Sequence, residues 1–223
     1  MPSVPSDRAI RPRAILFDWD NTLIDSWAVI HEAQNAVLDA FGHPRWSLEE
    51  TRARVQKSMR DSYPELFGER WEEAGELFYK HYRALHIERL VPLPGAHQML
   101  RGLRDAEIYL GVVSNKQGGI LRQESTHLGW DHLFGGLVGA SDAARDKPAI
   151  EPVLMALAAG GMAPGLDVWF VGDTDVDLRC AKVAGCLRVL LRDEPPLQDE
   201  FIDYAPDLYF PDCQTLSKFV ARL

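Results

Sequence analysis

Two aspartates separated by one residue follow a short apolar run near the start of the chain. Residues 14–17 (AILF) lead into Asp18, Trp19 and Asp20, and Thr22 stands two positions further on. The run is too short for a helix and is typical of a buried strand, so Asp18 would lie where a strand of a parallel sheet opens into a loop. Mutual repulsion and partial desolvation raise the pKa of a carboxyl group, so this pair indicates a bound cation, a proton-transfer role or both.

Three further polar clusters follow apolar runs or lie beside them. They are Ser114 with Asn115, Lys147 before Pro148, and Asp173 with Asp175 and Asp177. The carboxyl ends of parallel strands meet at one edge of a sheet, so clusters that are distant in sequence converge there. Acids, a hydroxyl, an amide and one lysine describe a site for Mg²⁺ and phosphate together. Carboxylate oxygens suit Mg²⁺, lysine supplies a positive charge for phosphate, and Ser114 with the Asn115 backbone can donate hydrogen bonds to it.

These four motifs resemble those of the haloacid dehalogenase (HAD) superfamily, and within it the phosphatases similar to phosphoglycolate phosphatase. The family pattern DxDxT matches residues 18–22, and its GDxxxD motif matches residues 172–177. Its strand-terminal Ser/Thr matches Ser114 and its lysine matches Lys147. A single DxD is a weak signal, whereas four motifs in order, covering the chain from Arg13 onward, are a strong one.

The resemblance implies an enzyme, a HAD-type phosphatase that hydrolyses phosphomonoesters through an aspartyl-phosphate. Asp18 would attack phosphorus, and Asp20 would protonate the leaving alcohol and then activate water. The implied cofactor is Mg²⁺, bound by the side chain of Asp18, the backbone carbonyl of Asp20 and the side chain of Asp173. Metal coordination of Asp18 but not of the Asp20 carboxylate would give the two acids different protonation preferences.

Further residues take supporting roles under the same resemblance. Ser114, Asn115 and Lys147 would hold the transferring phosphate oxygens. Asp177 would act on the metal through water or orient Lys147. Thr22 would shape the loop and take no part in the reaction.

Some residues bear on the choice of substrate and not on the reaction. Trp19 is bulkier than most residues between the two acids of the family, and we expect it to narrow the pocket. Asn21 stands where glycine is common in the family, but asparagine tolerates unusual backbone angles, so we expect the loop to be preserved. In the helical part of the chain, an anionic substrate could be contacted by Lys57, Ser58 or Arg60.

The elements that must position these residues form a core with an insertion. After the first strand the pattern is helical, with apolar residues spaced for helices over 27–41, from Ser47 onward and around 71–85. We predict a disordered leader over 1–12, an α/β core from 13–23 and 94–223, and a helical cap over 24–93. An insertion that directly follows the acidic loop is a natural lid over that loop.

The second part of the chain alternates strand-like and helical segments. This alternation predicts a doubly wound parallel sheet, a Rossmann-type core covered by helices on both faces. The expected strands are residues 108–113, 133–139, 167–171, 187–191 and 208–210, and the expected helices are residues 118–128, 150–159, 176–184 and 214–223.

Composition limits the partners and the compartment. The 24 basic and 33 acidic residues give a net charge of −9, which argues against a surface that binds nucleic acid or an anionic membrane. No apolar stretch approaches the roughly 20 residues of a membrane span. Cys180, Cys186 and Cys213 are odd in number and have no zinc-ligand spacing, so we expect small buried side chains and a reducing compartment, the cytoplasm.

Other functions on the same fold stay open at this stage. A phosphomutase uses the same aspartyl-phosphate, but members resembling β-phosphoglucomutase usually carry Glu-Asp where this chain has Gly172 and Asp173. A haloacid dehalogenase attacks carbon and has no need of Asp20 as a leaving-group acid. From another class, a non-catalytic regulatory or partner-binding protein would have no need of Asp18. Sequence patterns leave the particular substrate and the oligomeric state open.

Overall fold

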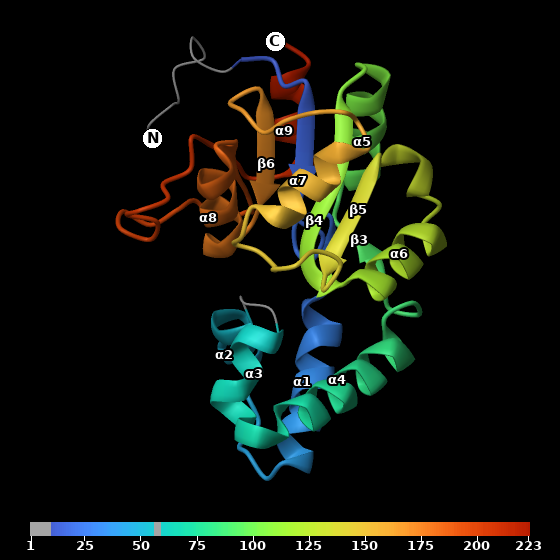
Figure 1. Cartoon of the computed structure of the whole chain (residues 1–223), viewed down its shortest axis with the longest axis vertical. Coiled ribbons are helices and arrows are strands. Elements are labelled where there is room, and N and C mark those ends of the chain that lie inside the picture. The colour runs from blue at the N-terminus through green and yellow to red at the C-terminus, as the bar shows by residue number, and fades with distance from the viewer. Residues whose placement is uncertain (1–9, 56–58) are drawn as a thin grey trace. The chain divides into compact units, whose positions relative to one another are not determined.

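The computed structural model describes residues 10–55 and 59–223, and Figure 1 traces the chain. Its contacts divide the chain into two units, one of residues up to 24 together with 92–223, and one of residues 25–91. The elements in chain order are β1 (Ala14–Phe17), β2 (Ile24–Asp25), α1 (Trp27–Ala40), α2 (Leu48–Arg54), α3 (Met59–Phe67), the 3₁₀ helix η2 (Gly68–Arg70), α4 (Trp71–Leu85), β3 (Val91–Pro92), α5 (Ala96–Asp105), β4 (Tyr109–Gln117), α6 (Gly118–His127), η3 (Asp131–Leu133), β5 (Gly136–Ala140), α7 (Glu151–Ala158), β6 (Val168–Gly172), α8 (Asp175–Ala184), β7 (Leu187–Leu191), β8 (Leu208–Phe210) and α9 (Cys213–Val220).

The sheet of the larger unit is parallel, as the alternating strand and helix pattern predicts. Its strand order is β5-β4-β1-β6-β7-β8. Phe17 of β1 pairs with Val112 of β4 on one side and with Val171 of β6 on the other. The chain moves outward from β1 through β4 to β5, then returns to the other side of β1 for β6, β7 and β8. Open parallel sheets bind ligands beyond the carboxyl ends of the strands where the winding reverses in this way.

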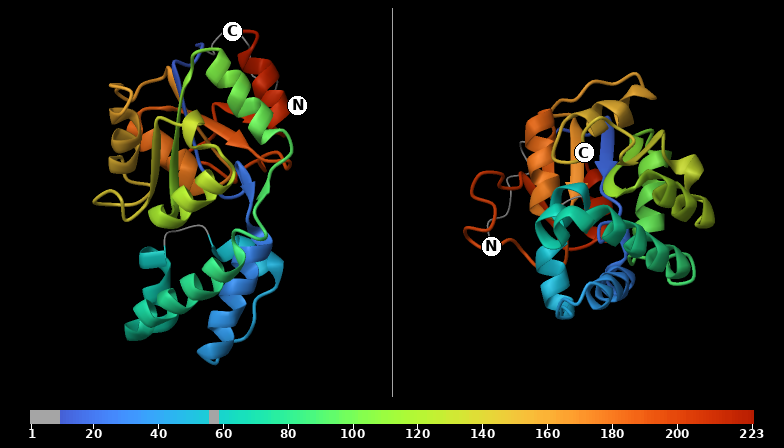
Figure 2. Two further views of the ribbon diagram at one scale, coloured as in Figure 1. Left: turned by 90° about the vertical axis from the view of Figure 1, so that its right-hand side faces the viewer. Right: turned by 60° about the horizontal axis from the view of Figure 1, so that its bottom comes forward.

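Neighbouring residues of the central strands pack against helices on opposite faces of the sheet. Figure 2 shows α7 and α8 on one face and α5 with α9 on the other. Phe170 of β6 belongs to a buried cluster with Val153 of α7 and Ala181 of α8. The adjacent Trp169 lies against Phe219 of α9, with ring centroids 6.2 Å apart. β1 and β6 are buried along their whole length, because both faces of the sheet are covered.

Residues 25–91 form a helical unit whose interior is aromatic. The rings of Phe78 and Tyr82 on α4 stack with centroids 5.7 Å apart, and Tyr63 of α3 meets Phe78 edge to face. The predicted start of α2 is confirmed. Ser47 Oγ accepts a hydrogen bond from the Glu50 N–H at 3.1 Å, and the Ser47 N–H donates to Glu50 Oε2 at 2.8 Å.

Three features differ from the sequence prediction. α3 is an additional helix, and the proline it contains, Pro64, obscures the helical pattern. α5 is also additional, although Met99, Leu100 and Leu103 have helical spacing and are buried. β4 does not end before Ser114 but continues to Gln117, with a shift of its pairing to β5 beyond Val113.

Parts of two predictions lie outside the described residues: positions 1–9 of the leader, and Lys57 with Ser58. The rest of the leader contacts the core unit, since Pro12 is buried and Arg11 Nη2 donates to the Ala106 carbonyl at 3.2 Å. Among the described helices, none is both long enough and apolar enough to traverse a bilayer.

We expect the native protein to react very slowly with thiol reagents. Cys180, Cys186 and Cys213 are unpaired and buried, as predicted. Burial raises the pKa of Cys180 to about 12 and the pKa of the other two thiols to about 11. Since the thiolate is the reactive form, Ellman's reagent at pH 8 should label all three only after unfolding in guanidinium. A stoichiometric fast phase without denaturant would contradict this burial.

Candidate active site

The loop after β1 carries the first two aspartates, and its start is tied to the sheet. The N–H of Asp18 donates to the Val171 carbonyl of β6 at 2.8 Å. The N–H of Trp19 donates to Asp18 Oδ1 at 2.7 Å, which orients that carboxylate. Asn21 has φ 60°, the left-handed conformation that asparagine tolerates, so the expectation for this position is confirmed.

Lys147 lies at the centre of the site and is almost inaccessible to solvent. Its side chain is 1% exposed, and its Nζ lies 2.9 Å from Asp18 Oδ1 and 2.7 Å from Asp177 Oδ1. Asn115 holds the lysine backbone from both sides: its Oδ1 accepts from the Lys147 N–H at 3.0 Å, and its Nδ2 donates to the Lys147 carbonyl at 3.3 Å. The side chain of Asn115 therefore fixes the loop that carries Lys147. Only the backbone of Asn115 is left to bind phosphate.

The turn between β6 and α8 positions the two later aspartates. Asp177 Oδ2 accepts hydrogen bonds from the Thr174 N–H at 3.1 Å and from Thr174 Oγ1 at 2.7 Å, which caps the start of α8. A Cβ on Gly172 would lie 2.3 Å from the Cβ of Asp177, so only glycine permits this close approach. Asp173 Oδ1 accepts from Thr22 Oγ1 at 3.2 Å, which joins this turn to the first loop.

Negative charge exceeds positive charge at this point. One carboxylate oxygen from each of Asp18, Asp173 and Asp177 lies within 4.8 Å of the others. Burial, with the charges of Asp177 and Asp20, raises the pKa of Asp18 to about 6 although Lys147 opposes this. Burial and the charges of Asp177 and Asp18 likewise raise the pKa of Asp173. The pKa of Lys147 is raised too, because Asp177 and Asp18 together outweigh the opposing effect of burial.

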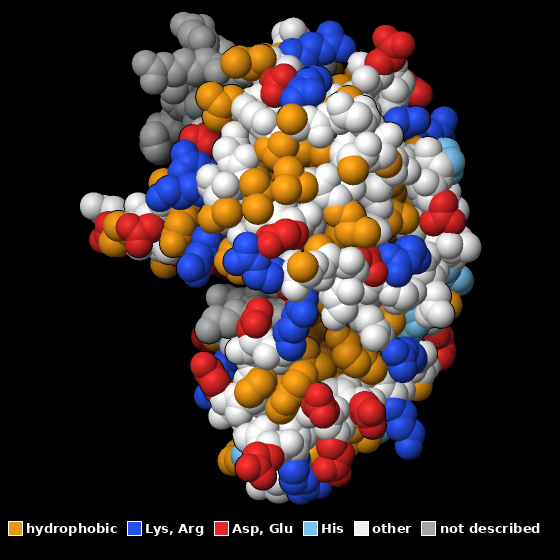
Figure 3. Space-filling model, viewed as in Figure 1, with side chains coloured by type: hydrophobic (Ala, Val, Ile, Leu, Met, Phe, Trp, Pro, Cys, Tyr) orange, Lys and Arg blue, Asp and Glu red, His pale blue; other side chains and the backbone are white. Residues whose placement is uncertain are grey.

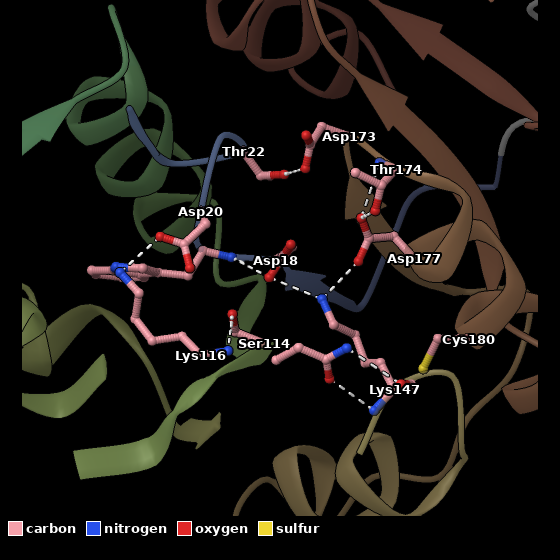
Figure 4. Close-up of polar contacts among 12 residues, drawn as sticks. Asp18, Asp20, Thr22, Ser114, Lys116, Lys147, Asp173, Thr174, Asp177 and Cys180 are labelled. Atoms are coloured by element: carbon pink, nitrogen blue, oxygen red, sulfur yellow. Dashed lines mark hydrogen bonds and ion pairs between the residues drawn. The ribbon is translucent and has the colours of Figure 1, made fainter. Parts of the chain in front are cut away.

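A second charged group lies on the other side of Asp18 (Figure 4). Lys116 Nζ lies 2.7 Å from Asp20 Oδ1 and 2.6 Å from Glu124 Oε2. The backbone N–H of Lys116 also donates to the Ser114 hydroxyl at 3.2 Å. The sequence analysis missed Lys116 and Glu124. The available signal was a glutamate on the buried face of α6, beside Leu121.

The prediction that Trp19 narrows the pocket is wrong. Its side chain is 0% exposed. Its ring packs edge to face on Trp130 and Phe134, at centroid distances of 5.8 and 6.3 Å, so it points into the core. Of the predicted substrate contacts in the helical unit, Arg60 is an exposed residue of α3, and the other two lie outside the described residues.

The arrangement can bind a hard cation and an oxyanion. Both oxygens of Asp177 have partners in Lys147 and Thr174. Within the described ranges, Asp18 Oδ2 and Asp173 Oδ2 have no hydrogen-bond partner. These oxygens suit a divalent cation or, at Asp18, attack on an electrophile. Ser114, 4% exposed on β4, offers a hydroxyl at the same edge of the sheet.

Comparisons with known proteins agree with this geometry. The family model described as haloacid dehalogenase-like hydrolase matches residues 15–191. A phosphoglycolate phosphatase of Xanthomonas campestris is 32% identical over 213 residues, which are 90% of this chain and 96% of the relative. A HAD-superfamily hydrolase from Ehrlichia chaffeensis is 31% identical, with a TM-score of 0.65 over 96% of this chain and 98% of that one. A haloacid dehalogenase-like protein from Streptococcus pneumoniae has a TM-score of 0.81 at 23% identity, over 94% of this chain and 98% of that one, and shows the shared fold.

Proposed function

Because the chain belongs to the haloacid dehalogenase-like hydrolase family, we propose that it is a Mg²⁺-dependent phosphomonoesterase that acts on a small phosphorylated metabolite. Curated relatives that the chain matches over most of its length are phosphoglycolate phosphatases, which supports a phosphatase. The substrate class that we propose is therefore phosphoglycolate or a similar small phosphate ester, sugar phosphates included.

The observation that carries the proposal is the group of three buried aspartates, Asp18, Asp173 and Asp177, in which one lysine, Lys147, pairs with Asp18 and Asp177. Burial and the neighbouring carboxylates raise the pKa of Asp18 and of Asp173, and Lys147 only partly opposes this. A divalent cation would supply the missing positive charge, and oxygen ligands suit Mg²⁺. We propose that Asp18 and Asp173 hold it with their side chains and that Asp20 contributes its backbone carbonyl. When bound, Mg²⁺ would neutralise charge on the phosphate oxygens.

The first chemical step is transfer of the phosphoryl group to Asp18. Its Oδ2 attacks phosphorus, since Oδ1 is held by Lys147 and by the Trp19 N–H. The bond between phosphorus and the alcohol oxygen breaks, and Asp20 gives its proton to that oxygen. The products are an alcohol, the phosphorylated Asp18 and an Asp20 carboxylate.

The second step is hydrolysis of the aspartyl-phosphate. The Asp20 carboxylate takes a proton from water, and the hydroxide oxygen attacks phosphorus as the bond to Asp18 breaks. This releases inorganic phosphate, frees Asp18 and returns the proton to Asp20. Throughout, we propose that Lys147 Nζ and the Ser114 hydroxyl hold the transferring oxygens and that Asp177, 2.7 Å from Lys147 Nζ, orients the lysine.

We propose a small-molecule partner and a cytoplasmic location. On the face shown in Figure 3, Lys and Arg side chains are scattered among Asp and Glu instead of gathering in a basic patch. Together with the net charge of −9, this gives no support to a nucleic-acid partner. Three unpaired, buried cysteines support a reducing compartment.

We expect the purified protein to release phosphate from p-nitrophenyl phosphate and phosphoglycolate only when Mg²⁺ is present. EDTA should lower the rate by about 100-fold or more, because a bound metal ion contributes several kcal/mol to stabilising charge in such reactions. Excess Mg²⁺ should restore the rate. The measurement is steady-state phosphate release across a panel of phosphorylated metabolites.

A binding readout separates the metal site from catalysis. Mg²⁺ should raise the Tm of the wild-type protein and of Asp39→Asn, an exposed acid of the helical unit, but not of Asp173→Asn. An identical Mg²⁺-dependent rise in all three proteins would rule out the proposed ligand. If the protein released halide from a 2-haloacid but no phosphate from any ester, the assignment as a phosphatase would be wrong and the protein would be a dehalogenase.

A further inference from the structure

We propose that Lys116, fixed by Glu124 and Trp19, is a positioning residue that holds the Asp20 carboxylate in place for proton transfer to the leaving group. The inference deepens the proposed function and rests on it. Lys116 and Glu124 lie outside the four motifs by which the chain resembles its family, and Trp19 occupies the variable position between the two aspartates of the first motif.

The contacts form one continuous chain from the core to the site. Trp19 Nε1 donates to Glu124 Oε2 at 2.6 Å, and Lys116 Nζ lies 2.6 Å from the same oxygen. Lys116 Nζ then reaches Asp20 Oδ1 at 2.7 Å. The exposed side-chain fraction rises along this chain, from 0% for Glu124 through 5% for Lys116 to 18% for Asp20. The only member with substantial access to solvent is therefore the proposed proton carrier.

The inner end of the chain cannot move easily. Trp19 is fully buried and is packed edge to face by Trp130 and Phe134. Glu124 lies on the buried face of α6, so its carboxylate is fixed by helix packing as well as by the indole N–H. A lysine side chain alone has many rotamers, and contact with a fixed carboxylate removes most of them. The ammonium group is thus held where it can orient Asp20.

Stability alone is a poor explanation for this group. Replacing a buried ion pair by well-packed apolar side chains is often neutral or stabilising, because desolvation offsets the attraction of the charges. The two lysines also have separate targets: Lys147 contacts Asp18 and Asp177, whereas Lys116 contacts Asp20 and Glu124. Figure 4 shows them on opposite sides of Asp18. Lys116 therefore acts on the proton carrier, and Lys147 on the nucleophile.

Trp19 connects the two catalytic aspartates, because it lies between them in the sequence and also contacts Glu124. Trp19 separates the nucleophile from the proton carrier, and its backbone N–H holds Asp18 Oδ1 at 2.7 Å. Its side chain, through Glu124, leads to Asp20. One residue thus links the orientation of both carboxylates. Correct placement of such groups matters because small misplacements lower rates severely.

The test compares Lys116→Met and Glu124→Gln with the wild-type enzyme on two substrates, p-nitrophenyl phosphate and phosphoglycolate. We expect kcat on phosphoglycolate to fall about 10- to 100-fold, as for other groups that orient a reacting residue, with little change in KM. The loss should be much smaller in the pre-steady-state release of nitrophenolate from p-nitrophenyl phosphate. Nitrophenolate leaves without a proton, and its release precedes the hydrolysis step in which Asp20 also acts. A merely structural effect would lower both rates equally.

Two controls complete the experiment. Arg122→Met breaks an ion pair on the exposed side of α6, between Arg122 and Asp142, and should leave both rates within about twofold of wild type. In an Asp20→Asn background, Lys116→Met should cause no further loss, because the group it orients is gone. If Lys116→Met does not fold, as judged by its thermal unfolding, the nearly isosteric Glu124→Gln carries the comparison.

The outcomes are distinguishable. Equal losses on the two substrates, or an additive loss in the Asp20→Asn background, overturn the positioning role while the phosphatase assignment stands. A wild-type protein that hydrolyses neither substrate nor any other phosphate ester overturns the proposed function, and the inference with it. A selective loss on phosphoglycolate in both variants supports the inference.

Discussion

Asp18→Asn should abolish hydrolysis of every phosphomonoester that the wild-type protein turns over. We expect the rate to fall by about 1,000-fold or more, the loss expected when a nucleophile is removed. An amide oxygen is a poor nucleophile, and the free Oδ2 is lost as an attacking group. The fold should be kept, since asparagine matches aspartate in size. The Oδ1 of the asparagine can still accept hydrogen bonds from the Trp19 N–H and from Lys147 Nζ, which lie 2.7 Å and 2.9 Å from Asp18 Oδ1 in the wild-type protein.

The same substitution should raise stability in metal-free buffer. The pKa of Asp18 is about 6, above its usual value of 3.8, because burial and neighbouring charges disfavour the ionised form. At pH 8 the carboxylate is ionised in both states, so the folded protein bears the cost of that charge and the unfolded chain does not. Asp18→Asn removes the cost, and the free energy of unfolding in EDTA should be equal to or greater than that of wild type.

Phosphate release in the presence of Mg²⁺ measures the loss of activity, and thermal unfolding in EDTA measures the change in stability. Asp105→Asn, at the exposed end of α5, is the matched control and should change neither. Activity in Asp18→Asn within tenfold of wild type would refute the assignment of the nucleophile. Loss of activity accompanied by a lower Tm would instead indicate a structural role for the Asp18 charge.

Much of the core was predictable because each strand is short and is bounded by its own local signal. The β7 and β8 bounds agree with the predicted segments, and β6 differs from its prediction by one residue at each end. A fully buried strand is apolar throughout and is followed by the polar residues of the sheet edge, so the boundary between them is sharp. This is why Asp18 and Asp173 could be placed at the carboxyl ends of strands from sequence alone, whereas the adjacency of β1 and β6 is known only from the structure.

The errors arise where a side chain's direction decides its role. Trp19 lies between two aspartates of the edge loop, and no periodic pattern says whether a loop side chain faces a ligand or the core. The partner of its indole, Glu124, lies 105 residues away in sequence. Lys116 lies on β4 beyond the predicted end of that strand, so the sequence pattern assigned it to a loop. Such contacts depend on tertiary packing, which local spacing does not encode.

Lys147→Met should lower the free energy of unfolding by about 3–5 kcal/mol, the range for breaking a buried ion pair by removing one partner. The lysine is 1% exposed, and its loss would leave Asp18 and Asp177 buried without a counter-charge. Activity should also be lost, since we propose that the ammonium group holds a phosphate oxygen. Lys182→Met, on the same helix as Asp177, is the matched control. Exposed Lys182 donates to the Asp203 carbonyl and lies 5.0 Å from the centroid of the Tyr204 ring, so its loss should cost less than about 1 kcal/mol.

A second substitution tests whether uncompensated charge causes this instability. Adding Asp177→Asn to Lys147→Met removes one of the two carboxylates that have lost their counter-charge. The amide oxygen can still accept from the Thr174 N–H, which lies 3.1 Å from Asp177 Oδ2 in the wild-type protein. The double variant should therefore be more stable than Lys147→Met alone, by about 1–2 kcal/mol of coupling, yet remain inactive. Urea unfolding in EDTA of the wild type, the two single variants and the double variant measures the four free energies. If the double variant were less stable than either single one, lost packing of the lysine chain would be the cause, and the electrostatic account of the site would fail.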